Sequence, residues 1–493
     1  MLIGSVVLYL VVTIAIGLWA AKRVHNSKDY VVAGRSLPLY MNAATVFATW
    51  FGAETVLSVS AEFAKNGMGS IIADPFGSSF CLVIVAIFFA RAFYRMDLLT
   101  IGDFYRKRYG RTMEIGTSVV IAISYLGWTA AQLTALGLAF STLSGGAISL
   151  QWGIVLSAVV VLAYTVWGGM WSVALTDLFQ SVMIIAGVGI IAWFVGDMAG
   201  GAGKVVAAAA EAGKFEFWPR GGSREWLYFF TAWATLALGS IPQQDIFQRV
   251  TSAENERTAI LGTLAGGVIY FAFAFVPIFI VFAALMVDPS LGQLLSAEDA
   301  REMQSILPSF ILRHTPLWVQ VLFFGALLSA LKSVASATLL APSVTFVESI
   351  WRQFKPRLGD REELLTMRVT VLGFAALVCA YAIHSQGTPI YDLVSSSYTL
   401  PLVGAFWPLL AGLYWKRATT QGAVFSIVLG LATWLFFLGT PAGKAFPAQL
   451  AGLLAGAVGM VVGSLGRQAL ANRHGAHHHL AGTSELVTES ARK

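Results

Sequence analysis

The sequence predicts an all-α integral membrane protein with about 13 transmembrane helices, two of them broken, arranged as a five-plus-five inverted repeat. The chain of 493 residues is 57% hydrophobic and only 12% charged, whereas soluble domains carry about 25% charged residues. Its apolar runs are about 20 residues or longer, which is the length of a membrane-spanning helix and not of a barrel strand. Two of these runs are interrupted near their middle.

Thirteen apolar runs are long enough to be predicted as spans. They cover approximately residues 2–21, 40–63, 70–92, 112–142, 150–168, 174–197, 225–247, 258–287, 316–349, 365–385, 389–413, 418–438 and 446–466. The first run has no positive segment before it and is followed by Lys22 and Arg23. We therefore predict a retained first span with the N-terminus outside and the C-terminus cytoplasmic, in a bacterial-type inner (plasma) membrane. This topology puts the loops rich in Lys and Arg inside, which explains the net charge of +6 without a nucleic-acid partner.

Four segments outside the spans have distinct compositions. Residues 98–110 predict a short amphipathic helix at the cytoplasmic surface, and the Gly- and Ala-rich loop 198–224 predicts a mobile connection. The loop 288–315 contains a helical run that would cover an external vestibule. The tail, 467–493, is polar and low in aromatics, which predicts disorder. Its histidines, His474 and 477–479, would either bind a metal or be simply solvated.

The two interruptions lie five spans apart. Phe47–Glu54 places Thr, Gly and a carboxylate in the second span, and Leu238–Gln244 places Gly and Pro in the seventh. Interrupted spans at matching positions of two halves indicate an inverted-repeat transporter with a midplane site. The alternative is that Gly and Pro are simply common in membrane helices. We predict one transmembrane domain over 1–466, with a first repeat at about 40–197 and a second at about 225–413.

The ninth run carries a lysine, Lys332, near its middle. A cation at the bilayer centre costs about 3 kcal/mol or more on insertion scales. Ser329, Lys332 and Ser333 share one helix face by their spacing, and Ser336 continues it. This face is small and polar, which suits close packing against other helices. We therefore expect Lys332 to have a partner or a task inside the bundle.

Three further motifs precede, open or follow predicted spans. They are Asp29-Tyr30-x4-Arg35-Ser36-Leu37, Gly168-Gly169-Met170-Trp171-x3-Leu175-Thr176-Asp177-x2-Gln180 and Gly239-x3-Gln243-x2-Ile246-x2-Arg249. With the Ser-rich ninth span, they make the chain resemble the sodium/solute symporter family, which includes proline, sugar and monocarboxylate symporters. The resemblance covers nearly the whole chain up to about residue 440. It implies alternating access, with the solute at the two breaks and a sodium ion between the first broken helix and the ninth span.

The resemblance implies a coupling-ion site built from backbone carbonyls at the first break and from a carbonyl and two hydroxyls in the ninth span. Aligned on the acidic Glu348, the matching positions are Ala48, Phe51, Ser329, Lys332 and Ser333. A register shifted by one residue would instead match Ala330 and Ser333–Val334. The first register is preferred because it also aligns Ser336 and Ser343 with serines common in the family. In either register one hydroxyl ligand is missing.

In the preferred register a lysine replaces the missing hydroxyl. Sodium needs oxygen ligands, whereas an ammonium donates hydrogen bonds to the same carbonyls. We therefore expect Lys332 to be a tethered cation that bridges the ninth span to the first broken helix and that loads and releases a proton. The coupling ion is then sodium or a proton, and transport through Lys332 is proton-coupled or uncoupled. Glu54 is the expected proton carrier or ion-pair partner, and the alternative is a permanent Lys332–Glu54 pair that only fastens two helices.

Polar and aromatic residues line the breaks and the facing helices. The candidates for solute binding are Trp50, Glu54, Tyr125, Trp128, Gln132, Thr231, Thr235, Gln243 and Tyr398. Such a set suits a small polar organic solute, although each ring could equally be ordinary packing. Free backbone donors at the unwound helix ends suit a carboxylate, which favours an amino acid or a monocarboxylate over a sugar. Asp177 and Glu348 are expected near cytoplasmic helix ends, as caps or inner-gate ion pairs.

These observations predict a secondary active transporter for a small solute. The alternative is a membrane solute sensor that signals to a partner protein. A channel would need rings of polar or acidic residues, and the spans show none. No span presents a nucleophile, base and orienting group at workable spacing, so an enzyme is not expected. We expect no cofactor, no metal beyond a sodium at the coupling-ion site, and no nucleic acid or obligate protein partner; the solute and the lipid bilayer are the expected partners.

Overall fold

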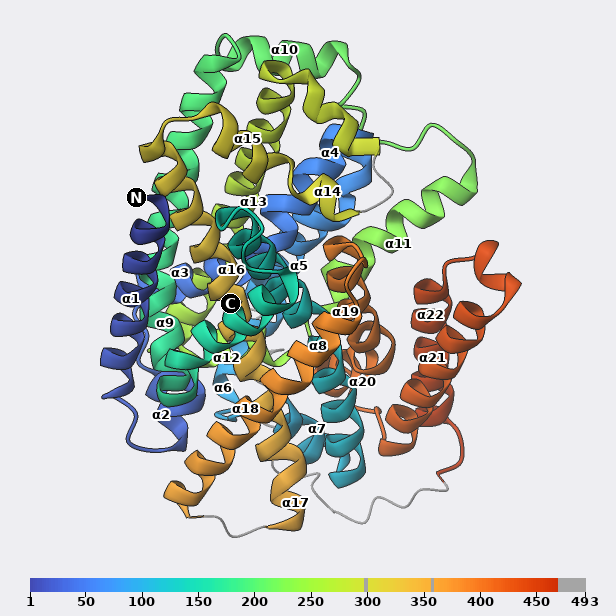
Figure 1. The fold of residues 1–493 in the computed structure, drawn as a ribbon. Coiled ribbons are helices and arrows are strands. Elements are labelled where there is room, and N and C mark those ends of the chain that lie inside the picture. The colour runs from blue at the N-terminus through green and yellow to red at the C-terminus, as the bar shows by residue number, and fades with distance from the viewer. Residues whose placement is uncertain (297–299, 356–358, 469–493) are drawn as a thin grey trace.

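The computed structural model describes residues 1–296, 300–355 and 359–468 (Figure 1). Over these ranges the chain is helical, with one isolated β-bridge and no strand, so the all-α prediction is confirmed. The α-helices are α1 (Leu2–Ala21), α2 (Ser27–Val32), α3 (Leu39–Trp50), α4 (Ser60–Asn66), α5 (Ser78–Ile84), α6 (Ala90–Arg95), α7 (Ile101–Tyr109), α8 (Arg111–Leu143), α9 (Leu150–Met198), α10 (Ala202–Glu211), α11 (Ser223–Gly239), α12 (Gln244–Ser252), α13 (Glu256–Val287), α14 (Ala300–Gln304), α15 (Ile306–His314), α16 (Leu317–Thr345), α17 (Arg352–Phe354), α18 (Asp360–His384), α19 (Ile390–Gly404), α20 (Phe406–Tyr414), α21 (Thr420–Gly439) and α22 (Ala448–Leu465).

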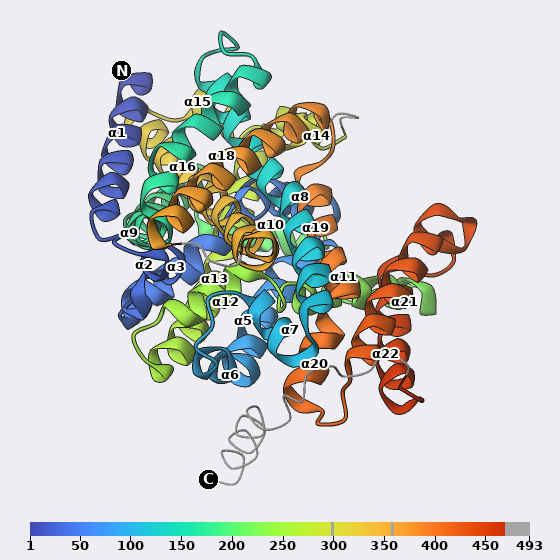
Figure 2. The same cartoon turned by 90° about the horizontal axis from the view of Figure 1, so that it is seen from below.

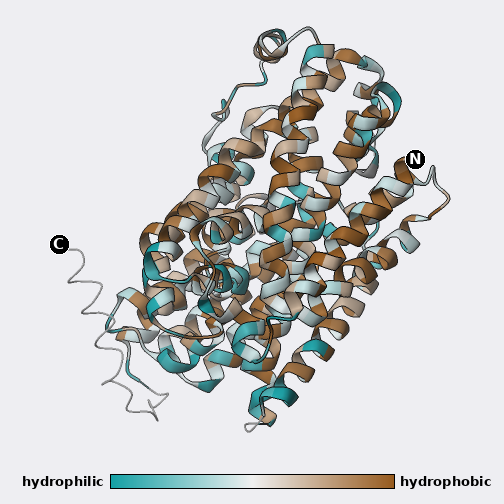
Figure 3. Ribbon diagram, turned by 90° about the vertical axis from the view of Figure 1, so that its left-hand side faces the viewer, coloured by the Kyte–Doolittle hydropathy of each residue, from teal (hydrophilic) through white to brown (hydrophobic). Residues whose placement is uncertain are grey.

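Many of these helices are membrane-spanning. Nine helices of the described chain are long and apolar enough to cross a membrane, and the bent pair α19–α20 raises the number to ten. Hydrophilic residues gather toward the two ends of the helix bundle, and hydrophobic residues cover the length between them (Figure 3). The protein is therefore a multi-pass membrane protein. The predicted count of thirteen remains a prediction, because it treats interrupted and merged helices as spans.

Both predicted interruptions are present. In the second predicted span, α3 ends at Trp50, and a π-helical segment, Glu54–Val59, precedes α4. In the seventh, α11 ends at Gly239 and α12 begins at Gln244. Pro242 falls between α11 and α12, where its missing N–H costs no helical hydrogen bond. The polar and Gly/Pro residues thus break each helix where the sequence indicated.

The fifth and sixth predicted spans appear as one helix, α9, bent at Gly169. This glycine has φ 48° and ψ −135°, which is not helical. A straight helix of 49 residues would be about 74 Å long, more than twice the hydrocarbon core of about 30 Å. A Cβ at Gly169 would also lie 2.4 Å from the backbone carbonyl oxygen of Tyr30. The bend therefore lets one continuous element pack as two segments, while the inverted repeat itself stays a prediction.

The long helices α8, α9 and α16 pack against one another in the interior, and α1 packs along α9 and α16 at one edge (Figure 1). The hairpin α21–α22 lies at the opposite edge, beside α19 (Figures 1 and 2). The core is continuous through α3, α8 and α16, which are largely buried. The two breaks therefore lie among the most buried helices.

The segments outside the spans follow the expectations in part. Residues 98–110 contain α7, whose N-cap Thr100 forms a capping box with Asp103. The loop 198–224 is more ordered than expected. It contains α10, and the backbone N–H groups of Met68 and Gly69 donate to carbonyls of this loop. The loop 288–315 contains α14 and α15, which fits the predicted helical run. The predicted tail from residue 469 onward, with its histidines, lies outside the described residues.

Candidate functional site

The first break is organised by Gln132 of α8. The helical hydrogen bonds of α3 stop with the Phe51 N–H, which donates to the Phe47 carbonyl, and they resume with the Val56 N–H, which donates to the Gly52 carbonyl. Between them, the Ala53 N–H donates to Oε1 of Gln132 at 3.0 Å. The unwound helix end was expected to leave backbone N–H groups free for a carboxylate of the solute. Here the Ala53 N–H instead bonds the side-chain amide of Gln132.

Glu54 is held beside this break by two donors from α8. Nε2 of Gln132 donates to one carboxylate oxygen at 2.8 Å, and Nε1 of Trp128 donates to the other at 3.3 Å. The residue is only 5% exposed. A buried carboxylate is costly unless it is hydrogen-bonded or paired with a cation. Glu54 therefore places a carboxyl group with two hydrogen-bond donors in the centre of the bundle.

Three aromatic rings pack against one another beside Glu54, and one of them, Trp128, donates to its carboxylate. The Trp50 and Tyr398 rings stack with centroids 6.1 Å apart and planes 7° apart. The Trp128 ring lies 6.0 Å from Trp50 and 5.3 Å from Tyr398. We call Trp50, Trp128 and Tyr398 the aromatic box. The predicted residues of α3, α8 and α19 are thus brought together beside one carboxylate.

The second break adjoins the same box. Nε2 of Gln243 donates to the Ser124 hydroxyl of α8 at 3.4 Å. The Tyr125 hydroxyl donates to Asp245 and accepts from the Asp245 N–H. A Cβ at Gly239 would lie 2.3 Å from the Tyr398 carbonyl oxygen, so the end of α11 packs directly on α19. The second break is therefore fixed to α8 and α19 on either side of the box.

The hydroxyls predicted on α11 have local partners. The Thr235 hydroxyl donates to the Thr231 carbonyl at 2.7 Å, and the Thr231 hydroxyl donates to the Leu227 carbonyl at 2.6 Å. Both bonds follow the helix, as Thr commonly does in membrane helices. In this structure these two hydroxyls are used within α11 and do not bond the aromatic box.

One of the predicted coupling-ion residues, Ser333, bonds Asp177 of α9. Its carboxylate accepts from Thr45 of α3 at 2.5 Å and from Ser333 of α16 at 2.5 Å. Ala48 and Phe51 lie at the end of α3 and are fully buried. Asp177 was expected near a cytoplasmic helix end. The structure corrects this, because Asp177 lies in the interior of α9 and bridges the first broken helix to α16.

Lys332 is fully buried on the same helix, α16. Its Nζ lies 4.5 Å from the centre of the Tyr9 ring of α1 and makes no hydrogen bond with any described residue. Among the described ion pairs there is none between Lys332 and Glu54. The permanent pair with Glu54 is therefore not formed in this structure. Ser329, one turn away, contacts the Tyr9 hydroxyl at 2.6 Å.

A further buried carboxylate, Asp74, lies near the aromatic box and was missed from the sequence. Hydroxyls of Ser78, Tyr270 and Thr55 donate to it. The Tyr270 ring lies 6.4 Å from Trp50. The signal available was a carboxylate before a proline in an apolar run, which is ambiguous without the fold. Tyr9 carried no signal at all, because a tyrosine in a first span is ordinary.

Glu348, predicted as a cap or gate residue, forms ion pairs at the end of the bundle where α7 and α17 lie (Figure 1). Arg352 bonds Glu348 at 2.7 Å and Glu363 of α18 at 2.7 Å. Both carboxylates are about 2% exposed, whereas the Arg352 side chain is 34% exposed. The arginine thus ties the end of α16 to the start of α18.

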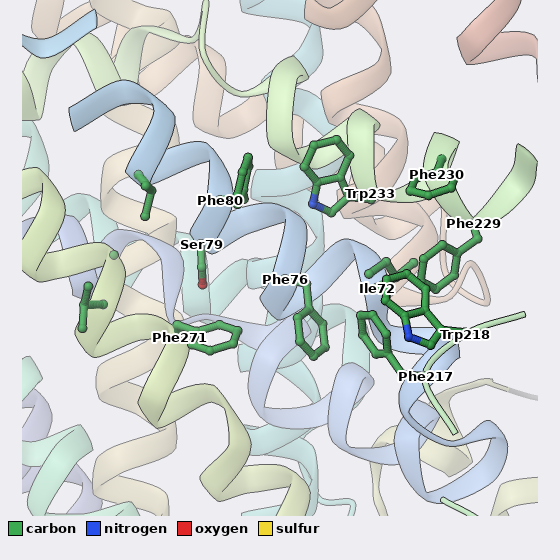
Figure 4. Close-up of a pocket in the computed structure, with 13 residues that line it drawn as sticks. Ile72, Phe76, Ser79, Phe80, Phe217, Trp218, Phe229, Phe230, Trp233 and Phe271 are labelled. Carbon is green, nitrogen blue, oxygen red and sulfur yellow. The ribbon is translucent and has the colours of Figure 1, made fainter. Parts of the chain in front are cut away.

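One cavity, of about 420 Å³, lies apart from the aromatic box (Figure 4). It is lined by rings of α5, α11 and α13 and of the segments before α5 and α11, and Ser79 supplies the one hydroxyl. None of the predicted solute-binding residues lines it. Its apolar walls do not suit a polar solute, so it is not part of the candidate site.

Comparisons with known proteins show which family this chain resembles. A model of the sodium:solute symporter family matches residues 30–430. The human high affinity choline transporter 1 is 28% identical over 443 residues, which cover 87% of this chain and 75% of the relative. The sodium/glucose cotransporter of Vibrio parahaemolyticus is 25% identical over 482 residues, covering 90% and 86%.

The fold is also shared with solved structures. A Na⁺-coupled sialic acid symporter, solved in a substrate-bound outward-open state, superimposes with a TM-score of 0.78. Its sequence is 20% identical, and the match covers 94% of this chain and 97% of that one. The family match extends over most of the chain and includes both breaks, α8, α9, α16 and α19. The chain therefore belongs to the sodium:solute symporter family.

Proposed function

We propose that this protein is a secondary active transporter that carries a small organic solute bearing an ammonium or quaternary ammonium group. The observation that carries the proposal is the aromatic box beside Glu54. Aromatic faces attract organic cations, and quaternary ammonium groups are bound in aromatic cages. A carboxylate beside the rings adds an attraction for the same charge. The name of the human relative, a choline transporter, supports this class of solute.

The same geometry argues against part of the sequence expectation. A monocarboxylate would meet the charge of Glu54, and the Ala53 N–H that could receive it already bonds Gln132. Like charges at close range in a buried site repel strongly. An amino acid keeps an ammonium group and stays compatible with the box. Transport is proposed to proceed by alternating access, with the two breaks on either side of the solute.

Lys332 is proposed to replace a ligand of the coupling sodium ion. In the register preferred from the family resemblance it takes a hydroxyl position, while Ser333 and Thr45 are engaged by Asp177. An ammonium held there competes with sodium by charge, so we propose proton-coupled or uncoupled transport. The family itself is sodium-linked by name, which makes sodium the competing coupling ion.

The proposed location is a bacterial-type inner membrane, with the N-terminus outside and the end of the bundle near α7 and α17 in the cytoplasm. The support is the positive-inside bias. The segments Lys22–Lys28 and Arg91–Arg111 carry many of the cations and lie at or next to that end, as do Arg352 and Lys355. We further propose that 1–466 is a single domain with the two repeats predicted above.

The function is tested by thermal stability of the purified protein with a panel of solutes. A bound solute stabilises the folded state by RT ln(1 + [L]/Kd). We expect choline, or an amino acid, to raise Tm, and glucose and lactate to leave it unchanged. The rise should disappear in Trp50→Leu and persist in the control Trp193→Leu, whose ring is 70% exposed to lipid. Stabilisation by lactate or glucose alone would contradict the proposed solute class.

Coupling is tested with the same protein at two pH values, with sodium replaced by potassium. We expect no effect of sodium on Tm, because Lys332 replaces an ion ligand. A pH effect that vanishes in Lys332→Met would support proton coupling. A clear rise of Tm with sodium would show that a sodium site survives, and the role given to Lys332 would be wrong.

A further inference from the structure

Among the described residues, one aromatic ring lies close enough to the ammonium of Lys332 to form a cation–π contact. This is Tyr9 of α1, whose ring centre lies 4.5 Å from Nζ. The ring face carries the negative end of the aromatic quadrupole and attracts a cation, more so where water is absent. Lys332 is fully buried, so the contact lies in such a place.

The Tyr9 ring is itself fixed in place. Its hydroxyl lies 2.6 Å from the Ser329 hydroxyl. Because Ser329 donates its own proton to the Gly325 carbonyl at 2.7 Å, the Tyr9 hydroxyl is the donor in this bond. The Tyr9 carbonyl in turn accepts from the Thr13 hydroxyl at 2.6 Å. The Tyr9 ring of α1 is thus anchored to Ser329, which lies on α16 one helical turn from Lys332.

Other charged and titratable groups lie on the elements packed around this part of α16. They are Tyr164 and Asp177 of α9, Asp245 and Arg249 of α12, and Glu54 beyond the first break. No hydrogen bond or ion pair joins any of them to the ammonium among the described residues. Tyr164 contacts only the backbone carbonyl of Lys332, at 3.3 Å. Asp177 is engaged by Thr45 and Ser333.

Most of α1 faces outward, which makes this inward contact informative. Its buried residues are Val6, Thr13, Gly17 and Ala20. The helix also precedes both predicted repeats, so it would ordinarily be assigned to anchoring. We infer that Tyr9 is a positioning residue for Lys332, and that α1 is thereby part of the coupling device. This inference rests on the role of Lys332 given under the proposed function.

The position matters because Ser333, next to Lys332, already bonds Asp177. Without the ring, the ammonium is free to turn toward that carboxylate and tie α16 to α9. Such an ion pair would add to the Ser333 bond that already joins α16 to α9, and it would engage the lysine permanently. The ring therefore keeps the lysine available and unpaired at the coupling site.

The inference is tested by a double-mutant cycle on the full-length protein, with Tyr9→Leu, Lys332→Met and the double variant. The readout is Tm across a pH series, which requires no known solute. Contacting residues show non-additive effects in such a cycle, whereas independent packing losses add. We expect Tyr9→Leu to change the pH profile of Tm by several degrees when Lys332 is present, and to have no pH-dependent effect in Lys332→Met.

Two further variants make the outcome sharp. Tyr9→Phe keeps the ring and should keep the wild-type pH profile, whereas Tyr9→Leu should not. Trp19→Leu removes a ring of the same helix that is 55% exposed, and it controls for insertion of α1. Strict additivity at every pH would overturn the positioning role of Tyr9. A clear non-additive effect, together with unchanged uptake of choline in Lys332→Met, would uphold the positioning role of Tyr9. It would reject the proposed coupling through Lys332.

Discussion

At the scale of single residues, Lys332 is the most costly side chain of the candidate site. A cation at the bilayer centre costs about 3 kcal/mol or more, and a desolvated contact with an aromatic face returns about 2 kcal/mol. The Tyr9 ring therefore does not repay the whole cost, and the described residues provide no ion pair that would. Stability alone does not account for a lysine here, which is why we assign it a functional role.

Replacing Lys332 by serine should restore the family's missing hydroxyl. Two adjacent hydroxyls, of residue 332 and Ser333, would then be present on α16, as the family resemblance implies for the sodium site. We expect Lys332→Ser to gain a sodium-dependent rise in Tm that the wild type lacks. The measurement is Tm in sodium and in potassium. Lys332→Met, which offers no oxygen, is the matched control. A rise of Tm with sodium in both variants would contradict the proposal that Lys332 acts as a tethered cation.

Glu54 is the second residue whose charge decides the function. Glu54→Gln keeps the size and removes the charge, and its single amide oxygen can accept from only one of the two donors, Gln132 or Trp128. We expect solute affinity to fall by about tenfold or more, which is about 1.4 kcal/mol or more. Titration of Tm against solute concentration measures it. The control is Glu62→Gln on α4. The Glu62 side chain bonds only Asn66 among the described contacts, so this variant should leave solute affinity unchanged. Equal losses of affinity in the two variants would argue against recognition of the solute by charge.

At the scale of elements, glycines decide where the long helices turn. A Cβ at Gly52 would lie 2.9 Å from both Val334 of α16 and the Glu54 carboxylate, so the first break needs a glycine to let α16 approach. At Gly169 both the space and the backbone angles exclude a side chain. These positions shape α3 and α9 around the candidate site without contacting a solute.

The bend of α9 gives a stability prediction with a control on the same helix. Gly169→Ala must adopt φ 48° and place a methyl 2.4 Å from the Tyr30 carbonyl oxygen. We expect a loss of about 2–4 kcal/mol of stability. A Cβ at Gly189 meets nothing within 4 Å, so Gly189→Ala should be neutral or stabilising by up to about 1 kcal/mol. Thermal unfolding of both proteins compares them, and equal effects would contradict the role of the bend.

At the scale of the whole molecule, the two ends of the bundle differ. One end is covered by α10, α14 and α15, and the other is closed by the ion pairs of Arg352 with Glu348 and Glu363. Removing one partner of a buried pair leaves the other charges uncompensated. The Arg352 cluster is therefore the point where α16 and α18 are fastened together.

Arg352→Gln should remove the ion pairs with Glu348 and Glu363 that hold the end of α16 to α18. We expect a loss of about 1–3 kcal/mol, which is below the 3–5 kcal/mol typical of fully buried pairs because the arginine is partly exposed. Lys355→Gln removes an exposed pair with Glu362 nearby and should cost at most about 1 kcal/mol. Tm of the two variants tests this, and a larger loss in Lys355→Gln would refute the fastening role.

The sequence by itself determined the class of the molecule. Apolar runs of membrane length, with few charges, leave helices as the way to satisfy backbone groups in lipid, and the structure is helical throughout its described part. Gly, Pro and polar residues inside two runs located both breaks correctly, because such residues weaken a helix wherever they occur. The sequence also named Trp50, Glu54, Trp128 and Tyr398 as candidates for solute binding, and that role stays a prediction.

The tertiary structure decided which of those residues meet. Gln132 satisfies the break and Glu54 at once, whereas Thr235 bonds only its own helix, and nothing in their spacing distinguishes the two. Lys332 was expected to face Glu54, but α16 is rotated so that its ammonium meets Tyr9, 323 positions earlier in the chain. Asp177 could be placed only once α9 was seen to bend at Gly169. Local composition sets where a helix forms or breaks, but contacts between distant helices depend on their rotation and packing, which the sequence pattern does not contain.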